Sequence, residues 1–231
     1  MSILTYPLGF IGGGKEFYNG VMENSIKTES QASLDYLEYT IPSTADNYTT
    51  WTFSWWMKRS EISSSNAQWI WGTAPGTNHN DFLLDSNDKL YFEWNNAGVS
   101  PSAPNSAGRS DIRFRDTSKW YHCVFVWDSN NGVQADRSRL YVNGKRESIT
   151  ISSGHAQGDK SYAFAGIGSG TNASNFRLLG YYFPTNQQAY HFNGYITDFY
   201  GIDGYALGPE NFGEYKEDVW IPKAYAGPPP I

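Results

Sequence analysis

The stretch Trp120-Tyr-His-Cys-Val-Phe-Val-Trp-Asp128 carries the strongest strand pattern in the chain and decides the fold. Successive side chains of a β-strand point to opposite faces of the sheet. One face of this stretch therefore carries Tyr121, Cys123, Phe125 and Trp127, and the other carries His122, Val124 and Val126. Both faces are largely apolar, which predicts a central strand that is covered on both sides.

The segments on either side of this stretch predict its neighbours in an antiparallel arrangement. Downstream, Arg139–Val142 and Glu147–Ile151 flank Asn143-Gly144, and an Asn-Gly pair between two strands favours a type I′ hairpin turn. Upstream, Trp51–Lys58 alternates apolar and polar residues, as a half-buried strand does. Because Trp56 interrupts the polar face, we expect it to be an exposed aromatic residue.

Shorter segments complete an all-β pattern. The other predicted strands are Tyr36–Ile41, Gln68–Gly72, Asp81–Leu84, Lys89–Trp94, Phe176–Phe183 and Tyr190–Ile202. A turn is predicted at Ser86-Asn87-Asp88, a surface loop over Ala97–Ser110, and one helical turn within Ala206–Tyr215. Aromatic residues make up 17% of the chain, which suits pleated, half-buried surfaces. Roughly ten to twelve short strands without βαβ alternation predict a jelly-roll sandwich of two antiparallel sheets.

The 231 residues suffice for a single domain of this class, with an arm at each end. Residues 1–30 form a lead-in punctuated by Gly12-Gly13-Gly14, residues 31–219 form the sandwich, and residues 220–231 form an extended, proline-rich tail. We expect both arms to dock on neighbouring subunits of a homo-oligomer or on other proteins.

Charge and composition exclude several classes of protein. The net charge is −6 and no basic patch stands out, so nucleic acid is not an expected partner. No run approaches the roughly 18 apolar residues of a membrane span, and the N-terminus lacks the pattern of a secretory leader. The lone Cys123 lies in an apolar strand, where we expect a small buried hydrophobe.

Three segments resemble the laminin-G-like branch of the concanavalin A-like lectin/glucanase superfamily. They are Trp120–Asp128, Leu140-Tyr-Val-Asn-Gly144, and Phe192-Asn-Gly-Tyr-Ile-Thr-Asp-Phe-Tyr-Gly-Ile202 with Ala206-Leu207. Their order and spacing match the family over roughly residues 33–215. The resemblance implies a concanavalin A-like sandwich, in which these aromatic and branched residues fill the space between two sheets.

A narrower resemblance is to lectin-like modules in virion proteins of tailed phages, notably marine ones. It is carried by Phe17-Tyr-Asn-Gly-Val21, Trp51–Arg59, Phe114–His122, and Asn211–Tyr215 with Trp220-Ile-Pro-Lys223. It implies a fibre, knob or capsid-surface decoration, made in a host cytoplasm and placed on the virion surface. Its expected partners are other virion proteins and host cell-surface carbohydrate.

Two candidate sites follow from the residue types. Carbohydrate binding needs an aromatic platform, and the candidates are Trp56, Trp71, Trp94, Tyr181 and Tyr182; the alternative for each is a place in the core. A calcium ion needs several oxygen ligands, and Asp81, Asp85, Asn87 and Asp88 supply them close together; the alternative is a polar hairpin turn. No other cofactor is expected.

The sequence favours binding over catalysis. Glycoside hydrolysis needs two carboxylates that flank one bond, and no Glu-x-Asp-x-Glu run of the family's glucanases is present. In a regular strand, Asp198 and Asp203 would point to opposite faces. The four histidines show no metal-ligand spacing. The hypotheses are therefore a virion structural protein, a free carbohydrate-binding lectin and, as the least favoured, a glycan hydrolase.

Overall fold

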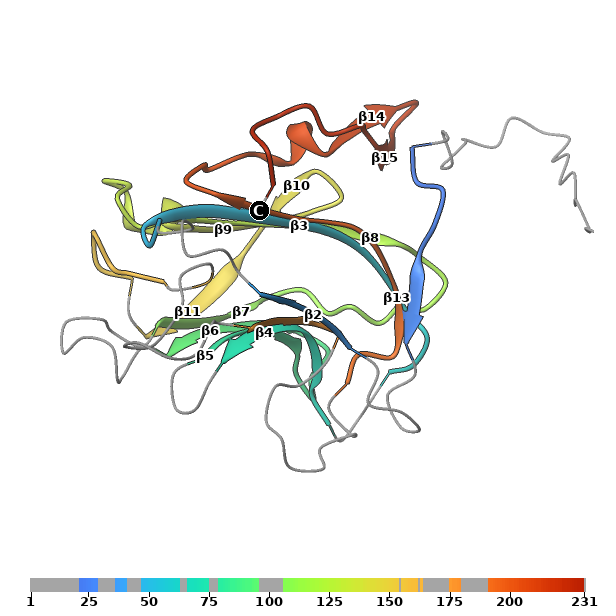
Figure 1. The fold of residues 1–231 in the computed structure, drawn as a ribbon, viewed down its shortest axis with the longest axis horizontal. Coiled ribbons are helices and arrows are strands. Elements are labelled where there is room, and N and C mark those ends of the chain that lie inside the picture. Colours follow the sequence, from blue (N-terminus) through green and yellow to red (C-terminus); the bar gives the residue numbers. More distant parts are fainter. Residues whose placement is uncertain are drawn as a thin grey trace, which may run out of the picture.

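The computed structural model describes residues 21–28, 36–40, 47–62, 66–74, 79–95, 106–153, 155–161, 163, 175–179 and 191–230. Two large antiparallel sheets lie face to face, and a two-stranded hairpin forms a small third layer on one of them (Figure 1). The predicted all-β sandwich is thus confirmed.

The first sheet has six strands, all antiparallel to their neighbours. Its order is β1 (Ile26–Thr28), β13 (Gly194–Asp203), β3 (Thr50–Arg59), β8 (Tyr121–Asp128), β9 (Ser138–Val142) and β10 (Lys145–Glu147). A short 3₁₀-helix, η1 (Gln134–Asp136), leads into β9. Strand β8, the predicted central strand, is flanked on both sides as its sequence indicated.

The second sheet has seven strands. Its order is β11 (Ile149–Ser153), β7 (Ser106–Ser110), β6 (Leu90–Asn95), β5 (His79–Leu84), β4 (Gln68–Ala74), β12 (Asn175–Leu178) and β2 (Leu37–Thr40). The sequence placed the residues of β7 in a loop, and that prediction is wrong. The strand carries small residues because a Cβ atom at Gly108 would lie only 2.5 Å from the ring of Phe92 on the adjacent β6.

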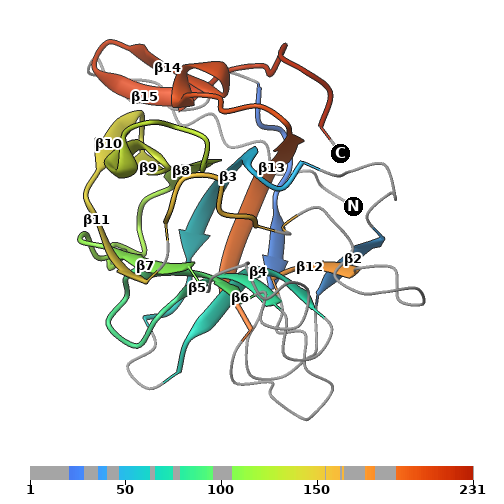
Figure 2. The same cartoon turned by 90° about the vertical axis from the view of Figure 1, so that its left-hand side faces the viewer.

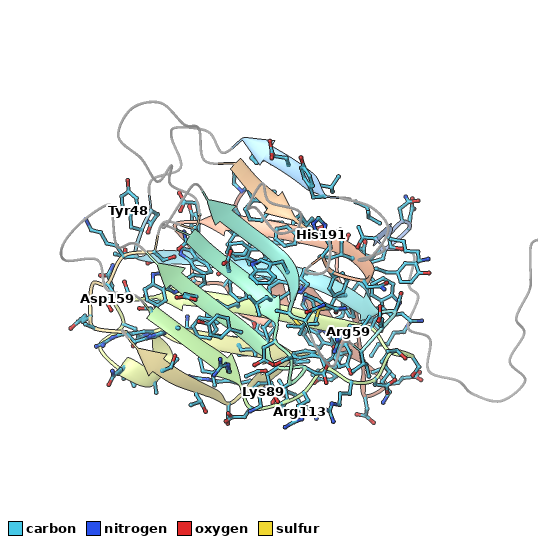
Figure 3. All side chains as sticks on the ribbon, turned by 90° about the horizontal axis from the view of Figure 1, so that it is seen from below. Tyr48, Arg59, Lys89, Arg113, Asp159 and His191 are labelled. Atoms are coloured by element: carbon cyan, nitrogen blue, oxygen red, sulfur yellow. The ribbon has the colours of Figure 1, made fainter. Side chains whose placement is uncertain are left out.

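Large aromatic rings fill the space between the two sheets. Trp51 on β3 contacts Trp94 on β6, with ring centroids 5.1 Å apart. Phe125 on β8 contacts Phe82 on β5 at 4.8 Å. Figure 3 shows the side chains of the described residues on the ribbon, seen from below. Burial of such rings is the main source of stability in a sandwich of this kind.

The predicted Asn-Gly hairpin is confirmed, but its second strand divides between the two sheets. Asn143 and Gly144 have φ of +48° and +78°, and a type I′ turn requires positive φ at both positions. Strand β10 ends at Glu147, and β11 begins at Ile149 in the other sheet, paired with β7. This crossing joins the sheets at one edge of the sandwich.

The outer face of β8 is covered by the C-terminal part of the chain. That part comprises the 3₁₀-helix η3 (Pro209–Asn211), which confirms the predicted helical turn, and the hairpin of β14 (Gly213–Lys216) and β15 (Val219–Pro222). Figure 2 shows this hairpin above the six-stranded sheet. Phe212 packs on Val124 and Val126, and its ring stacks on Tyr225 at 5.0 Å. The C-terminal segment therefore docks on the chain's own sheet.

Two strands lie outside the predicted sandwich bounds of 31–219. Strand β1 pairs with β13 although it falls in the expected lead-in. Strand β15 belongs to the hairpin although its last residues fall in the expected tail. Residues 1–20 of the expected N-terminal arm lie outside the described residues.

Candidate functional site

An open groove lies along one side of the sandwich, where both sheets end. Strand β1 is the edge of the six-stranded sheet and β2 is the edge of the seven-stranded sheet. The two edge strands, both blue, lie on the same side of the molecule in Figure 2. Between them is a groove of about 600 Å³, which we call the edge groove. Its size is that of a small-molecule site.

The walls of the edge groove are apolar and unusually exposed. Ile26 on β1 is 44% exposed, and Leu37 and Tyr39 on β2 are 47% and 49% exposed. Phe53 and Phe176 also line the groove and belong to the core beneath it. Exposed apolar side chains that gather around one hollow mark a binding surface more often than scattered ones do.

A β-bulge places a carboxylate in this groove. The register of β13 against β3 shifts between Thr197 and Tyr200, so that Asp198 and Phe199 both lie opposite Trp55. Phe199 packs against the core, while Asp198 lines the groove. Asp198 has a φ of +46°, in the left-handed region that residues other than glycine rarely adopt. Bulges of this type re-aim side chains and are frequent next to functional sites.

The Asp198 carboxylate is in an unusual chemical state for a surface residue. It is half-buried, and burial raises the pKa of its carboxyl group. Among the described residues it has no hydrogen-bond or ion-pair partner. Burial, followed by the nearby Asp198 charge, raises the pKa of the Tyr200 hydroxyl, which also lines the groove. An unpartnered carboxylate in apolar surroundings is a strong acceptor for donors on a ligand.

The predicted aromatic platform is wrong for the three tryptophans that the structure describes. Trp56, Trp71 and Trp94 are 1%, 0% and 0% exposed, so none presents a face to a ligand. Trp71 and Trp94 lie between the sheets, 6.4 Å apart. Trp56 lies on the outer face of the six-stranded sheet, where its ring stacks on His122 beneath the C-terminal layer. Tyr181 and Tyr182 lie outside the described residues.

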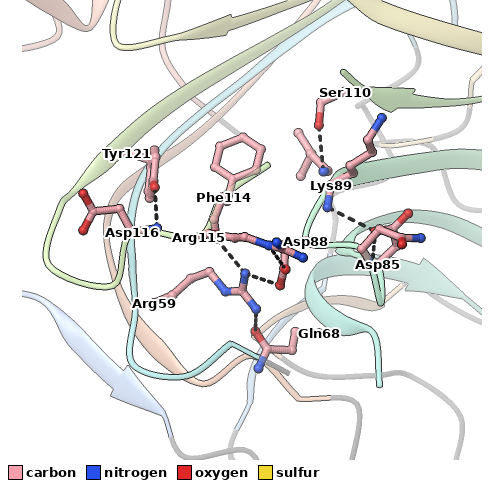
Figure 4. A network of polar contacts seen from close by, with 12 residues as sticks. Arg59, Gln68, Asp85, Asp88, Lys89, Ser110, Phe114, Arg115, Asp116 and Tyr121 are labelled. Carbon is pink, nitrogen blue, oxygen red and sulfur yellow. Dashed lines mark hydrogen bonds and ion pairs between the residues drawn. The ribbon is translucent and has the colours of Figure 1, made fainter. Parts of the chain in front are cut away.

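The predicted calcium cluster is also wrong, because its central carboxylate already has cationic partners. Asp88 is 1% exposed; Arg59 donates to its Oδ1 at 2.8 Å and Arg115 donates to its Oδ2 at 2.7 Å (Figure 4). Asp85 Oδ1 accepts the backbone N–H groups of Asn87 and Lys89, at 2.8 and 3.1 Å, and so closes the β5–β6 turn.

The fourth predicted ligand, Asp81, lies within the sheet. It pairs with Gly72 on β4, and its carboxylate occupies the space that a side chain at Gly72 would need. Within the described part of the chain, no group of three or more His, Cys, Asp or Glu residues is placed to hold a metal ion. The alternative interpretation, a polar hairpin turn, is the one the geometry supports.

A buried serine–histidine pair on the outer face of the six-stranded sheet has the wrong proton arrangement for catalysis. The indole N–H of Trp220 donates to His122 Nδ1 at 2.9 Å. Because an indole is only a donor, Nδ1 is an acceptor and the ring proton is on Nε2, which donates to Ser54 Oγ at 2.9 Å. A catalytic histidine needs Nε2 free to accept the serine proton. His122 therefore holds the hairpin to the sheet.

Comparison with known proteins places this chain in a family. A family model described as the concanavalin A-like lectin/glucanases superfamily, of the Laminin_G_3 type, matches residues 33–201. The chain therefore belongs to that superfamily and has a lectin-like fold. A search of curated proteins finds no match.

Solved structures show the same architecture at low sequence identity. Domains LG4-5 of the mouse laminin α1 chain match with a TM-score of 0.51 and 12% identity, over 84% of this chain and 47% of that one. This chain thus spans about half of the laminin fragment. A heptameric SAP-like pentraxin from Limulus polyphemus matches with a TM-score of 0.47 and 14% identity, over 77% and 73% of the two chains. These comparisons do not test the phage resemblance, which stays a prediction.

Among the described residues there is also no helix with the length and apolar character that spanning a membrane requires.

Proposed function

We propose that this protein is a non-catalytic glycan-binding module and that the edge groove is its binding site. The observation that carries the proposal is the position of Asp198, whose carboxylate lines an exposed apolar groove without a partner among the described residues. A folded chain gains nothing from such a group by itself, because a half-buried carboxylate without hydrogen bonds is destabilising.

Sugars match both chemical features of the groove. Their hydroxyl groups donate hydrogen bonds, which a carboxylate accepts strongly. The C–H face of a sugar ring is apolar and packs against flat side chains such as Tyr39, which is 49% exposed at the rim. The ligand class that the groove fits best is therefore a neutral oligosaccharide.

Hydrolysis is the second candidate, and one observation favours it: Glu38 and Asp198 both line the groove. The pair considered from sequence, Asp198 and Asp203, does not serve. The bulge removes the argument from strand parity, but Asp203 pairs with Trp51 whereas Asp198 lies opposite Trp55. Four residues of strand span about 13 Å, which exceeds the roughly 5–9.5 Å between glycosidase carboxylates.

The site is tested by a glycan array, followed by titration calorimetry of each neutral oligosaccharide that binds. Asp198→Asn should weaken binding about 10- to 100-fold, because a hydrogen bond to a charged group contributes about 1.5–3 kcal/mol. Asparagine tolerates a positive φ, so the backbone is expected to persist. Glu214→Gln, which removes an exposed charge from β14, should bind as the wild type does.

Two results would contradict this assignment. The first is the absence of binding at millimolar concentrations of every glycan on the array. The second is unchanged affinity in Asp198→Asn. Chromatography of the incubated sugars separates binding from hydrolysis: new reducing ends that disappear in Asp198→Asn would favour the second candidate.

We further propose that the module is carried on a phage virion, as a fibre, knob or surface decoration. This proposal is supported only by the resemblance in the four segments quoted above. Mass spectrometry of purified particles with copy number tests it. Hundreds of copies would indicate a capsid decoration, a few copies in multiples of three would indicate a fibre, and absence from particles would leave a free lectin.

A further inference from the structure

A second groove lies on the other side of the six-stranded sheet from the core, beneath the hairpin β14–β15. Its volume is about 690 Å³, and we call it the hairpin groove. The end of β3, the segment before β8, the β9–β10 hairpin and the C-terminal hairpin contribute its walls. Its lining includes Lys58, Lys119, Trp120, Lys145, Tyr215 and Trp220.

The hairpin groove is locally basic in an acidic protein. Three lysines line it, against two carboxylates, those of Glu147 and Asp218, whereas the whole chain has a net charge of −6. Lys119 has an ion pair with Asp116 at 2.9 Å. Among the described residues, Lys58 and Lys145 form no ion pair or side-chain hydrogen bond, although Lys145 interacts electrostatically with Glu147, and Lys58 is partly buried. A lysine ammonium that is not held in an ion pair is available to an anionic ligand.

Aromatic rings line the same groove as these lysines. Tyr215 is 50% exposed, and its orientation is fixed at two points. Its ring meets Trp220 edge-on, with centroids 4.9 Å apart, and its hydroxyl donates to the Asn143 carbonyl at 2.9 Å. The partly exposed Trp120 lines the same groove. A fixed, flat ring in a groove that lysines also line suits a ring-shaped anion better than a small inorganic ion.

We infer that the hairpin groove binds an acidic saccharide, one that carries carboxylate or sulfate groups. The charged groups would contact Lys58 and Lys145, and the sugar ring would pack against Tyr215. The hairpin that closes this groove, with Tyr215 and Trp220, lies beyond residue 201, where the family match ends, whereas Lys58 and Lys145 lie within the matched residues. The inference is independent of the edge groove and of its neutral ligand.

The test is calorimetric titration of the full chain with four probes at about 0.05 and 0.5 M salt. The probes are an oligogalacturonate, a heparin tetrasaccharide, neutral cellotetraose and sodium sulfate. At least one acidic saccharide should bind, more weakly at high salt because exposed charges are screened over a few ångströms there. Binding of the oligogalacturonate shows that carboxylates suffice, whereas binding of the heparin tetrasaccharide alone indicates that sulfate groups are needed, because heparin carries both.

Charge-removing variants locate the site. The double variant Lys58→Gln, Lys145→Gln should bind the acidic saccharide about 25-fold more weakly, at about fivefold for each exposed charge pair. Lys216→Gln is the matched control, because Lys216 is an exposed lysine on the same hairpin but does not line the groove. It should bind as the wild type does, and so should Asp198→Asn. Thermal melting confirms that each variant is folded.

Three outcomes would overturn the inference. They are no binding of either acidic saccharide, binding by the double lysine variant as tight as that of the wild type, or displacement of the bound saccharide by an equal concentration of sodium sulfate. Displacement by a polyglutamate peptide with the same lysine dependence would replace it with a peptide site. Failure of the edge-groove proposal would be seen in different measurements, because that proposal concerns the binding of neutral sugars and its loss in Asp198→Asn.

Discussion

At the scale of single residues, buried polar groups hold layers of the structure together, a role that their residue types alone do not reveal. His122 is enclosed between two rings, with its ring centroid 4.6 Å from that of Trp56 and 5.8 Å from that of Trp220. Both of its nitrogens have partners in the neutral form. The residue therefore joins the C-terminal layer to the sheet only while it is uncharged.

This arrangement predicts an acid-sensitive stability. Burial lowers the pKa of His122 to about 3, below the usual 6.5 of the unfolded chain. Between those values the unfolded state binds a proton that the native state does not, so stability falls as pH falls, by about 1.4 kcal/mol per pH unit. Urea unfolding at a series of pH values should show this slope and lose it in His122→Gln. An identical pH dependence in both proteins would contradict the assignment.

The buried ion pair of Arg59 and Asp88 makes a second prediction at this scale. Asp88→Asn leaves the Arg59 guanidinium, 1% exposed, without a charged partner. Breaking a buried pair in this way costs about 3–5 kcal/mol of unfolding free energy. Asparagine accepts the positive φ of this position, so the loss reports on charge rather than backbone. Chemical denaturation measures it, with Asp136→Asn in an exposed ion pair as the control; a loss below about 1 kcal/mol would contradict it.

At the scale of elements, the hairpin β14–β15 completes the sandwich. Without it the outer face of β8, with Val124 and Val126, would meet water. Trp220→Ala removes a ring that is 9% exposed, together with its hydrogen bond to His122, and should cost about 3–5 kcal/mol. Tyr215→Ala, on the exposed side of the same hairpin, should cost much less. Equal losses in the two variants, measured by thermal or urea unfolding, would show that the hairpin is not an anchor.

The elements also show what a strand pattern can and cannot predict. Alternating or doubly apolar runs identified β3, β5, β6, β8 and β9, because burial on one face or two leaves a period of two in the sequence. Strand β7 was missed because its Ser-Ala-Gly-Arg-Ser sequence has no hydrophobic period. The Phe92 ring lies so close to Gly108 that it leaves no room for a side chain there. Which segment covers the outer face of β8 is a long-range fact that no local pattern carries.

The candidate site was harder to predict than the fold for a related reason. Sequence alone ranked tryptophans as a platform, but a sandwich with this many rings uses them first to fill its interior. Asp198 was considered only as a catalytic acid, because nothing local marks the bulge that turns it into the groove. Tyr39 gave no signal, since its exposure depends on β2 being a sheet edge.

At the scale of the whole molecule, both grooves combine the sandwich of the family match with segments outside it. The edge groove is formed mainly by the sandwich that the family match covers, with strand β1 and the residues just before it on one side of the match and Pro230 on the other. The hairpin groove depends on residues after the match. If both proposed sites bind glycan, the molecule would hold two chemically different segments of a glycan surface at once, and its avidity would rise.

Amide chemical-shift mapping of the labelled protein, with a neutral oligosaccharide that binds on the array, shows most sharply whether the edge groove holds a glycan. We expect the largest shifts on β13 around Asp198 and on β2 around Tyr39, and we expect Asp198→Asn to abolish them at the same sugar concentration. Shifts confined to other strands, or shifts that persist unchanged in Asp198→Asn, would contradict the assignment of the edge groove as the glycan site.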